Sequence, residues 1–170
     1  MTDSLMPSFS AKSQDAIEQA LRLAIHYHAG QRDKAGECYM LHLMRVMLAC
    51  STPEAMQVAV LHDVLEDTSA KAEELIGAGM AREVVEAVIL LTKPDGMAYE
   101  EYVVRLSGNE LAKQVKIADI HDNYRLDRVA YRRNHGDEDR QRIERYILSH
   151  DFLTGEICLE EYLGRMASIE

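Results

Sequence analysis

The segment MQVAVLHDVLEDT, residues 56–68, decides how the chain can fold, because it sets four polar groups into an apolar helical run. These groups are His62, Asp63, Glu66 and Asp67. On a continuous helix, residues four apart share a face, so His62 would lie beside Glu66 and Asp63 beside Asp67. Carboxylates this close repel one another and are costly to bury without compensation. A divalent cation compensates them, so the segment indicates a metal site; the alternative is an exposed acidic helix end.

Two further apolar segments each contain a side chain that can bind metal. YMLHLMRVMLA (39–49) contains His42, and AKQVKIADIHDNYRL (112–126) contains Asp119. Alone, His42 is most simply a hydrogen-bonded core histidine, and Asp119 a structural carboxylate. Together with the first segment they supply two imidazoles and two carboxylates from three predicted helices. Such a set can hold one first-row divalent metal and leave positions for water and substrate. The predicted ligands are His42, His62, Asp63 and Asp119.

Composition excludes several classes of protein. The chain has 170 residues, of which 47% are hydrophobic, so it is long enough to bury a core. It has no uninterrupted apolar run of membrane-spanning length and no signal-peptide pattern at its start. Its cysteines, Cys38, Cys50 and Cys158, are odd in number and far apart, which favours reduced thiols and a cytoplasmic location. A net charge of −10 argues against a nucleic-acid binder.

The hydrophobic periodicity is helical almost everywhere, without the alternation typical of strands. We therefore predict an all-α helical bundle that forms a single domain over 1–170, with its motifs between about residues 14 and 150. We expect the first helix to be capped by Ser13 and to end near Gly30. Further helices are expected at 39–50, 53–67, 70–76, 81–91, 99–106, 110–124, 137–150 and 157–166.

The order of these motifs, H … HD … D, resembles that of the HD superfamily of metal-dependent phosphohydrolases. HAGQRDKAGECYMLH (28–42), AVLHDVLEDT (59–68) and VKIADIHDN (115–123) are similar to segments of the hydrolase domain of RelA/SpoT-type proteins. Without a synthetase domain, the chain resembles the small, stand-alone alarmone hydrolases of that group.

This resemblance implies an all-α HD fold with one bound metal, usually Mn²⁺. It implies hydrolysis of the 3′-pyrophosphate of guanosine tetra- or pentaphosphate, (p)ppGpp, to GDP or GTP and pyrophosphate. The four predicted ligands match the metal ligands of the family, and Glu66 and Asp67 match the acidic pair that orients and deprotonates the attacking water. The residues that match substrate contacts are Lys34 and Asn123 and, more weakly, Lys93 and Arg142.

The loop GQRDKAG (30–36) departs from the family, because Asp33 stands where an arginine stacks on guanine, with Arg32 one position earlier. Either Arg32 does the stacking, or the substrate is another nucleotide or a phosphorylated metabolite. Two non-enzymatic alternatives are a nucleotide-sensing HD module and an interaction protein whose metal only stabilises the fold. Glu66 and Asp67 favour the enzyme, because neither is needed to hold metal. His121, His135 and His150 are expected to have no functional partners. The expected ligand is a small nucleotide, and neither nucleic acid nor a membrane is an expected partner; the sequence does not determine the oligomeric state.

Overall fold

The computed structural model describes residues 9–33, 36–125 and 136–169, with the side chains of 136–139 left out. Within these ranges every regular element is a helix, as predicted, and the one extended feature is an isolated antiparallel bridge between Arg32 and Cys38. The helices are α1 (Ala11–Tyr27), α2 (Tyr39–Leu48), α3 (Pro53–Leu61), α4 (Val64–Asp67), α5 (Ala72–Gly77), α6 (Arg82–Leu91), α7 (Tyr99–Ser107), α8 (Glu110–Asn123), α10 (Gly136–Thr154) and α11 (Leu159–Met166).

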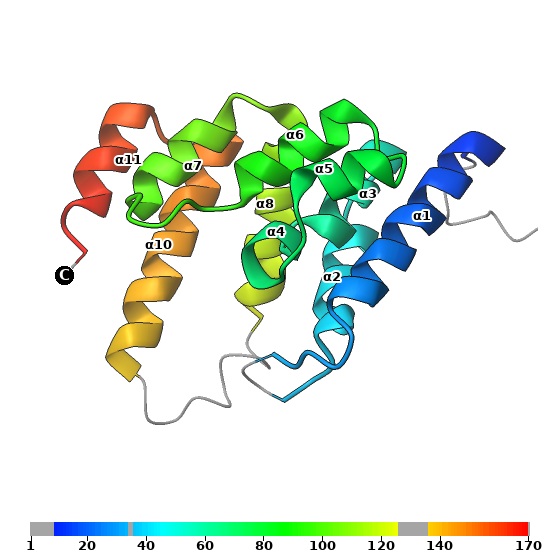
Figure 1. Cartoon of the computed structure of the whole chain (residues 1–170). Coiled ribbons are helices and arrows are strands. Elements are labelled where there is room, and N and C mark those ends of the chain that lie inside the picture. The colour runs from blue at the N-terminus through cyan, green and yellow to red at the C-terminus, as the bar shows by residue number, and fades with distance from the viewer. Residues whose placement is uncertain (1–8, 34–35, 126–135, 170) are drawn as a thin grey trace, which may run out of the picture.

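The centre of the bundle is α3, which packs against α1, α2, α6 and α8 (Figure 1). All residues from Ala55 to Leu61 are buried, so this helix is apolar on every side, as expected of a helix enclosed by others. Its one buried polar side chain, Gln57, donates a hydrogen bond to the carbonyl of Pro53. Figure 1 shows α1 and α2 at one end of the molecule and α10 and α11 at the other, with α8 between them.

The predicted helix over residues 53–67 is wrong in one respect, because the chain turns after Leu61. His62 and Asp63 form that turn, and the single-turn helix α4 follows. Neighbouring residues on a helix point about 100° apart, so an unbroken helix would have separated these two side chains. The turn therefore decides where His62 and Asp63 point.

Helix caps account for most of the remaining boundaries. Thr52 caps α3 by accepting a hydrogen bond from the N–H of Ala55, with Pro53 in the first turn, as predicted. The cap of α1 is Ser10 and not Ser13, since the Ser10 hydroxyl accepts from the N–H of Ser13. At the other end of the chain, α10 extends beyond its predicted end to Thr154.

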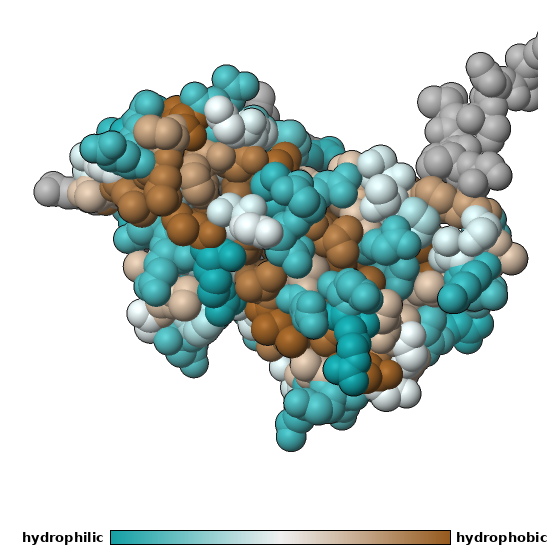
Figure 2. Space-filling model, turned by 90° about the horizontal axis from the view of Figure 1, so that it is seen from above, coloured by the Kyte–Doolittle hydropathy of each residue, from teal (hydrophilic) through white to brown (hydrophobic). Residues whose placement is uncertain are grey.

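No helix in the described part of the chain is both long enough and apolar enough to cross a membrane. Figure 2 shows one face of the molecule, on which brown hydrophobic areas alternate with teal hydrophilic ones. Large apolar side chains that stay exposed occur on several helices, among them Leu41, Leu48, Ile89 and Leu163. Such scattered exposure is ordinary for a folded domain.

Helix α2 offers a matched test of the core, because Leu43 is fully buried and Leu41 is 47% exposed. We expect Leu43→Ala to lower the free energy of unfolding by about 3 kcal/mol, since it leaves a cavity beside α3. Leu41→Ala should lower it by less than about 1 kcal/mol. Urea denaturation followed by circular dichroism measures both. Equal losses in the two variants would contradict the packing of α2.

Candidate metal centre

Four side-chain atoms from α2, the turn after α3, and α8 converge at one buried point. They are Nε2 of His42, Nε2 of His62, Oδ2 of Asp63 and Oδ1 of Asp119. The Asp63 oxygen lies 3.1 Å from Nε2 of His62 and 3.8 Å from Nε2 of His42. The Asp119 oxygen lies 3.6 Å from Nε2 of His62 and 3.4 Å from Nε2 of His42. Adjacent ligand atoms bonded to one ion at about 2.1 Å lie about 3.0–3.4 Å apart. The nitrogen–oxygen distances among these four residues, called the metal centre below, are therefore close to those that a single ion requires.

The turn after Leu61 brings two sequence neighbours to this point. His62 has helical backbone angles, whereas Asp63, with φ −98° and ψ −1°, departs from the values of a regular helix. The expectation that His62 shares a helix face with Glu66 was based on an unbroken helix and does not hold in that form. The two candidate ligands of this turn are therefore consecutive residues.

Both imidazoles are held by their second ring nitrogen. Nδ1 of His42 lies 2.7 Å from Oδ2 of Asp122, and Nδ1 of His62 lies 2.6 Å from the carbonyl oxygen of Ala59. Such contacts fix the tautomer of a metal-binding histidine and direct Nε2 toward the ion. Asp122 is itself held by Arg45, whose guanidinium donates to both carboxylate oxygens at 2.6 and 3.1 Å.

Asp122 and Arg45 were missed as site residues in the sequence, although a signal was present. Asp122 lies three residues after Asp119, and Arg45 three residues after His42, so each shares a helix face with a predicted ligand. An ion pair between two helices cannot be deduced from one sequence until the two faces are known to meet.

Asp119 is bound on both oxygens. The Lys116 ammonium donates to Oδ2 at 2.9 Å, and the Asn123 amide donates to Oδ1 at 2.6 Å. The Lys116 side chain is only 11% exposed, and its ammonium lies 5.3 Å from the centre of the Tyr102 ring. Burial alone would raise the pKa of Asp119, but Lys116 and the two imidazoles hold it well below the usual range. The carboxylate is therefore ionised, with Oδ1 directed at the histidines.

Tyr39 links the metal centre to the acidic pair. Its hydroxyl lies 2.5 Å from Oδ2 of Asp63 and 3.0 Å from Oδ2 of Asp67, and its ring stacks on His28 at a centroid distance of 5.2 Å. Burial, followed by the charge of Asp63, raises the pKa of Tyr39, so the hydroxyl stays a donor. Tyr39 was also missed in the sequence, although it lies one helical turn before His42.

The acidic pair lies on α4, at the solvent side of the metal centre. Glu66 and Asp67 are both exposed. Oε2 of Glu66 accepts a hydrogen bond from the backbone N–H of Lys93 at 2.9 Å, which ties α4 to the segment after α6. The Lys93 ammonium donates to the carbonyl of Met97, 3.2 Å away. Arg142 lies half-buried on α10, a helix that packs against α8.

The loop between α1 and α2 is closed by its own polar groups. Oδ1 of Asp33 accepts from the N–H of Glu37 at 2.9 Å, and the Arg32 guanidinium donates to the carbonyl of Gly36 at 2.8 Å. Gly36 has a φ of 83°, a left-handed conformation that favours glycine. The Asp33 side chain thus stabilises the turn by accepting this hydrogen bond, and Arg32 is exposed on the loop. The predicted contact Lys34 lies outside the described residues.

The chemistry of the donor set fits a divalent cation. Nε2 of His62 is buried without a hydrogen-bond partner, although two carboxylate oxygens lie nearby. A buried nitrogen in this position is ready to bind an ion. His42, His62 and Asp119 are all buried and have ligand atoms within 4.8 Å of one another, and Asp63 completes the set from the solvent side.

Comparisons with known proteins agree with this architecture. No protein-family model matches the chain. A solved structure of a metazoan ortholog of SpoT, described as hydrolysing ppGpp, superimposes with a TM-score of 0.63. It covers 94% of this chain and 96% of its own, at 20% sequence identity. The chain has the fold of this SpoT ortholog.

A second relative is a GTP pyrophosphokinase of Streptomyces coelicolor, 27% identical over 162 residues. The match takes in 85% of this chain but only 18% of the much longer relative. Both comparisons confirm the predicted resemblance to RelA/SpoT-type proteins.

The metal centre makes stability depend on pH in the metal-free protein. Burial alone would lower the pKa of His42 and His62, but the surrounding carboxylates outweigh it and raise both. A raised pKa stabilises the fold below the pKa of a free imidazole, about 6.5, and this contribution is lost as the pH rises through the folded value. We expect the Tm of metal-free protein to fall as the pH rises above the ordinary imidazole pKa of about 6.5.

Mn²⁺ binds neutral imidazoles, so the rise in Tm on adding Mn²⁺ should grow over the same pH range. Differential scanning calorimetry with and without chelator measures both effects. His26→Gln, which removes an exposed histidine on α1, serves as the control and should leave the profile unchanged. A buried metal site would be contradicted if the Tm of the metal-free protein rises with pH, or if the Tm is the same before and after verified metal removal.

Proposed function

We propose that the chain is a metal-dependent phosphohydrolase that removes the 3′-pyrophosphate of (p)ppGpp, with GDP or GTP and pyrophosphate as products. The observation that carries the proposal is the convergence of His42, His62, Asp63 and Asp119 on one point, with Asp67 joined to it through Tyr39. The fold supports it, because the SpoT ortholog with the same fold is described as hydrolysing ppGpp.

The cofactor in this proposal is one divalent ion held by the metal centre, with Mn²⁺ as the leading candidate. Two nitrogen and two oxygen donors suit a first-row ion of intermediate softness. Such an ion supplies a Lewis acid that acidifies water and neutralises phosphoryl charge. Lys116 keeps Oδ2 of Asp119 occupied, so that carboxylate offers a single oxygen and leaves more of the coordination sphere to water and substrate.

Glu66 and Asp67 carry the proton chemistry in this mechanism. Glu66 is exposed, and one of its oxygens is anchored by the N–H of Lys93, so the other can accept a proton from the attacking water. Asp67 shares the Tyr39 hydroxyl with Asp63, so its carboxylate is oriented toward the metal centre. Neither acid is needed to hold the ion, which favours an enzyme over a sensing module or a metal that only stabilises the fold.

The substrate contacts are assigned by chemistry. A bis-diphosphate carries several negative charges, and Lys34, Lys93 and Arg142 are the cations proposed to meet them, against an overall charge of −10. Asn123 uses one amide N–H for Asp119, and an amide has a second one that can reach a nucleotide. Arg32 is the only arginine of the loop 28–38 and is the proposed partner of the base.

The loop also supports a second candidate, the same hydrolysis on another nucleotide or phosphorylated metabolite. Asp33 caps the N–H of Glu37, and the Arg32 guanidinium binds the carbonyl of Gly36. Stacking on guanine would require Arg32 to leave that carbonyl. A substrate that needs no stacking arginine would leave the loop as it is.

An assay separates the two candidates. The protein is incubated with Mn²⁺ and ppGpp in parallel with ATP, GTP, dATP and NADPH, and the products are resolved by chromatography, with a chelator control. Chelator-sensitive release of pyrophosphate from ppGpp alone is the expected result. Hydrolysis of another nucleotide with ppGpp untouched would replace the alarmone by that substrate. Turnover of none of them would contradict the hydrolase.

Glu66→Gln tests the assignment of the proton acceptor. The amide keeps the shape and the hydrogen bond to Lys93 but cannot take a proton, so kcat should fall by a factor of about 10²–10⁴. Bound metal, measured by atomic absorption, should be unchanged, because Glu66 is not a ligand. Glu86→Gln, an exposed glutamate on α6, is the matched control and should retain full activity. Survival of activity in Glu66→Gln would show that another group accepts the proton.

A further inference from the structure

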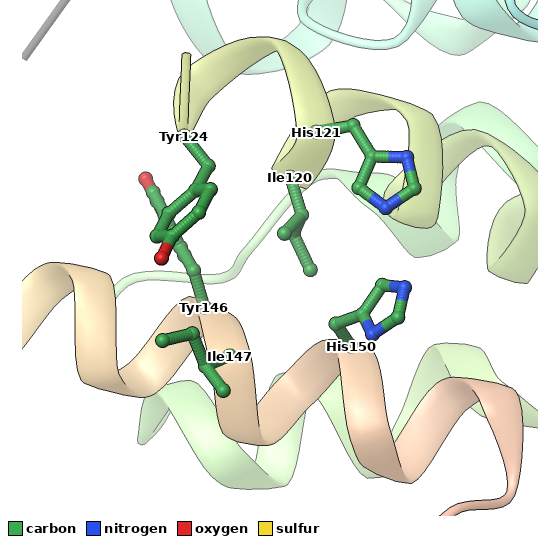
Figure 3. A pocket seen from close by; sticks show the side chains of 6 residues that line it. All are labelled: Ile120, His121, Tyr124, Tyr146, Ile147 and His150. Atoms are coloured by element: carbon green, nitrogen blue, oxygen red, sulfur yellow. The ribbon is translucent and has the colours of Figure 1, made fainter. Parts of the chain in front are cut away.

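A second pair of histidines lies outside the metal centre, between α8 and α10. His121 comes from α8 and His150 from α10, and their ring centroids are 5.0 Å apart with the planes tilted by 37°. Figure 3 shows the two rings projecting from opposite helices into one gap, with a ring nitrogen of each directed toward the other ring. These histidines were expected to have no functional partners, but the fold brings their rings into contact with each other.

The spacing of the rings is that of two imidazoles on one ion. With metal–nitrogen bonds of about 2.0–2.1 Å in a tetrahedral arrangement, the ring centroids lie about 5.2 Å apart. The rings of His42 and His62 in the metal centre are 5.3 Å apart. The pair between α8 and α10 therefore needs almost no movement to bind an ion.

The neighbouring carboxylate of Asp151 also favours a metal site at this pair of histidines. Nδ1 of His150 lies 3.4 Å from Oδ1 of Asp151. A carboxylate at the rear nitrogen fixes the tautomer of a metal-binding histidine and leaves Nε2 for the ion. The side chains of His150 and Asp151 are 32% and 30% exposed, so water can reach the pair and fill the other coordination positions.

The surroundings decide which ion fits. The two rings line a cavity of about 200 Å³ whose other walls are Ile120, Tyr124, Tyr146 and Ile147, as Figure 3 shows. A site whose protein ligands are imidazoles favours Zn²⁺, Ni²⁺ or Cu²⁺ over the more oxygen-seeking Mn²⁺. We propose that His121 and His150 form a second metal site, selective for zinc-like ions, that joins α8 to α10. It is independent of the proposed function.

The site would act on the two helices that border the proposed substrate contacts. Helix α8 carries Asp119 and Asn123 in addition to His121, and α10 carries Arg142 in addition to His150. An ion bound to both rings would fix the separation of these helices.

Equilibrium dialysis of the chelator-stripped full chain against Zn²⁺ tests the proposal. Wild-type protein should bind one equivalent more than His150→Gln and one more than His121→Gln, whereas His26→Gln, the exposed control on α1, should bind as much as wild type. Asp151→Asn should keep the stoichiometry and weaken this site roughly tenfold. Circular dichroism verifies that each variant is folded, and His121, which is exposed, gives the same test if His150→Gln fails to fold.

Two results would overturn the second site: equal Zn²⁺ stoichiometry in wild type, His121→Gln and His150→Gln, or an extra equivalent that Mn²⁺ fills equally well. His62→Gln keeps this test separate from the metal centre. If the metal centre does not bind Zn²⁺ but the second site does, wild type and His62→Gln both bind one equivalent of Zn²⁺. The double variant with His62→Gln and His150→Gln then binds none.

Discussion

The buried carboxylate of Asp119 is the interaction on which the rest of the structure depends. An ionised group in the middle of a helical bundle is stable only if opposite charges and donors surround it. Lys116 and Asn123 meet it from its own helix, while His42 and His62 meet it from α2 and from the turn after α3. Three segments distant in sequence are thus drawn to one point by one charge. The apolar packing around α3 holds them there.

Two sets of polar groups balance the charge around this point. The ligand atoms of the metal centre face one another. A second set of groups forms hydrogen bonds to these ligands: Lys116, the Arg45–Asp122 pair and Tyr39. Lys116 occupies the oxygen of Asp119 that does not face the centre, and Asp122 binds the rear nitrogen of His42. Tyr39 instead donates to the Asp63 oxygen that faces the centre. Apolar packing around these contacts tolerates substitution, which agrees with a fold shared at 20% identity.

Much of this arrangement could be predicted from the sequence. His42, His62, Asp63 and Asp119 were recognisable because each interrupts an apolar helical pattern, and the pattern itself gave the all-α fold. The turn after Leu61 was not predictable from periodicity, because a two-residue break leaves the hydrophobic spacing almost unchanged. Tyr39, Arg45 and Asp122 were missed because their roles arise only when α2 meets α8 and α4. The pairing of His121 with His150 likewise depends on how α10 packs, and no local pattern encodes that.

Helix α4 is only one turn long, too short to be stable by itself, so the position of its acids depends on contacts from elsewhere. One of these contacts runs from the loop before α2: His28 binds the side-chain carbonyl of Gln31, and the amide of Gln31 donates to the carbonyl of Asp67 at 3.0 Å. The loop that carries Arg32 is therefore joined by hydrogen bonds to α4, which carries Asp67. A displacement of the loop would therefore be transmitted through Gln31 to the backbone of Asp67, which couples the position of this acid to the conformation of the loop.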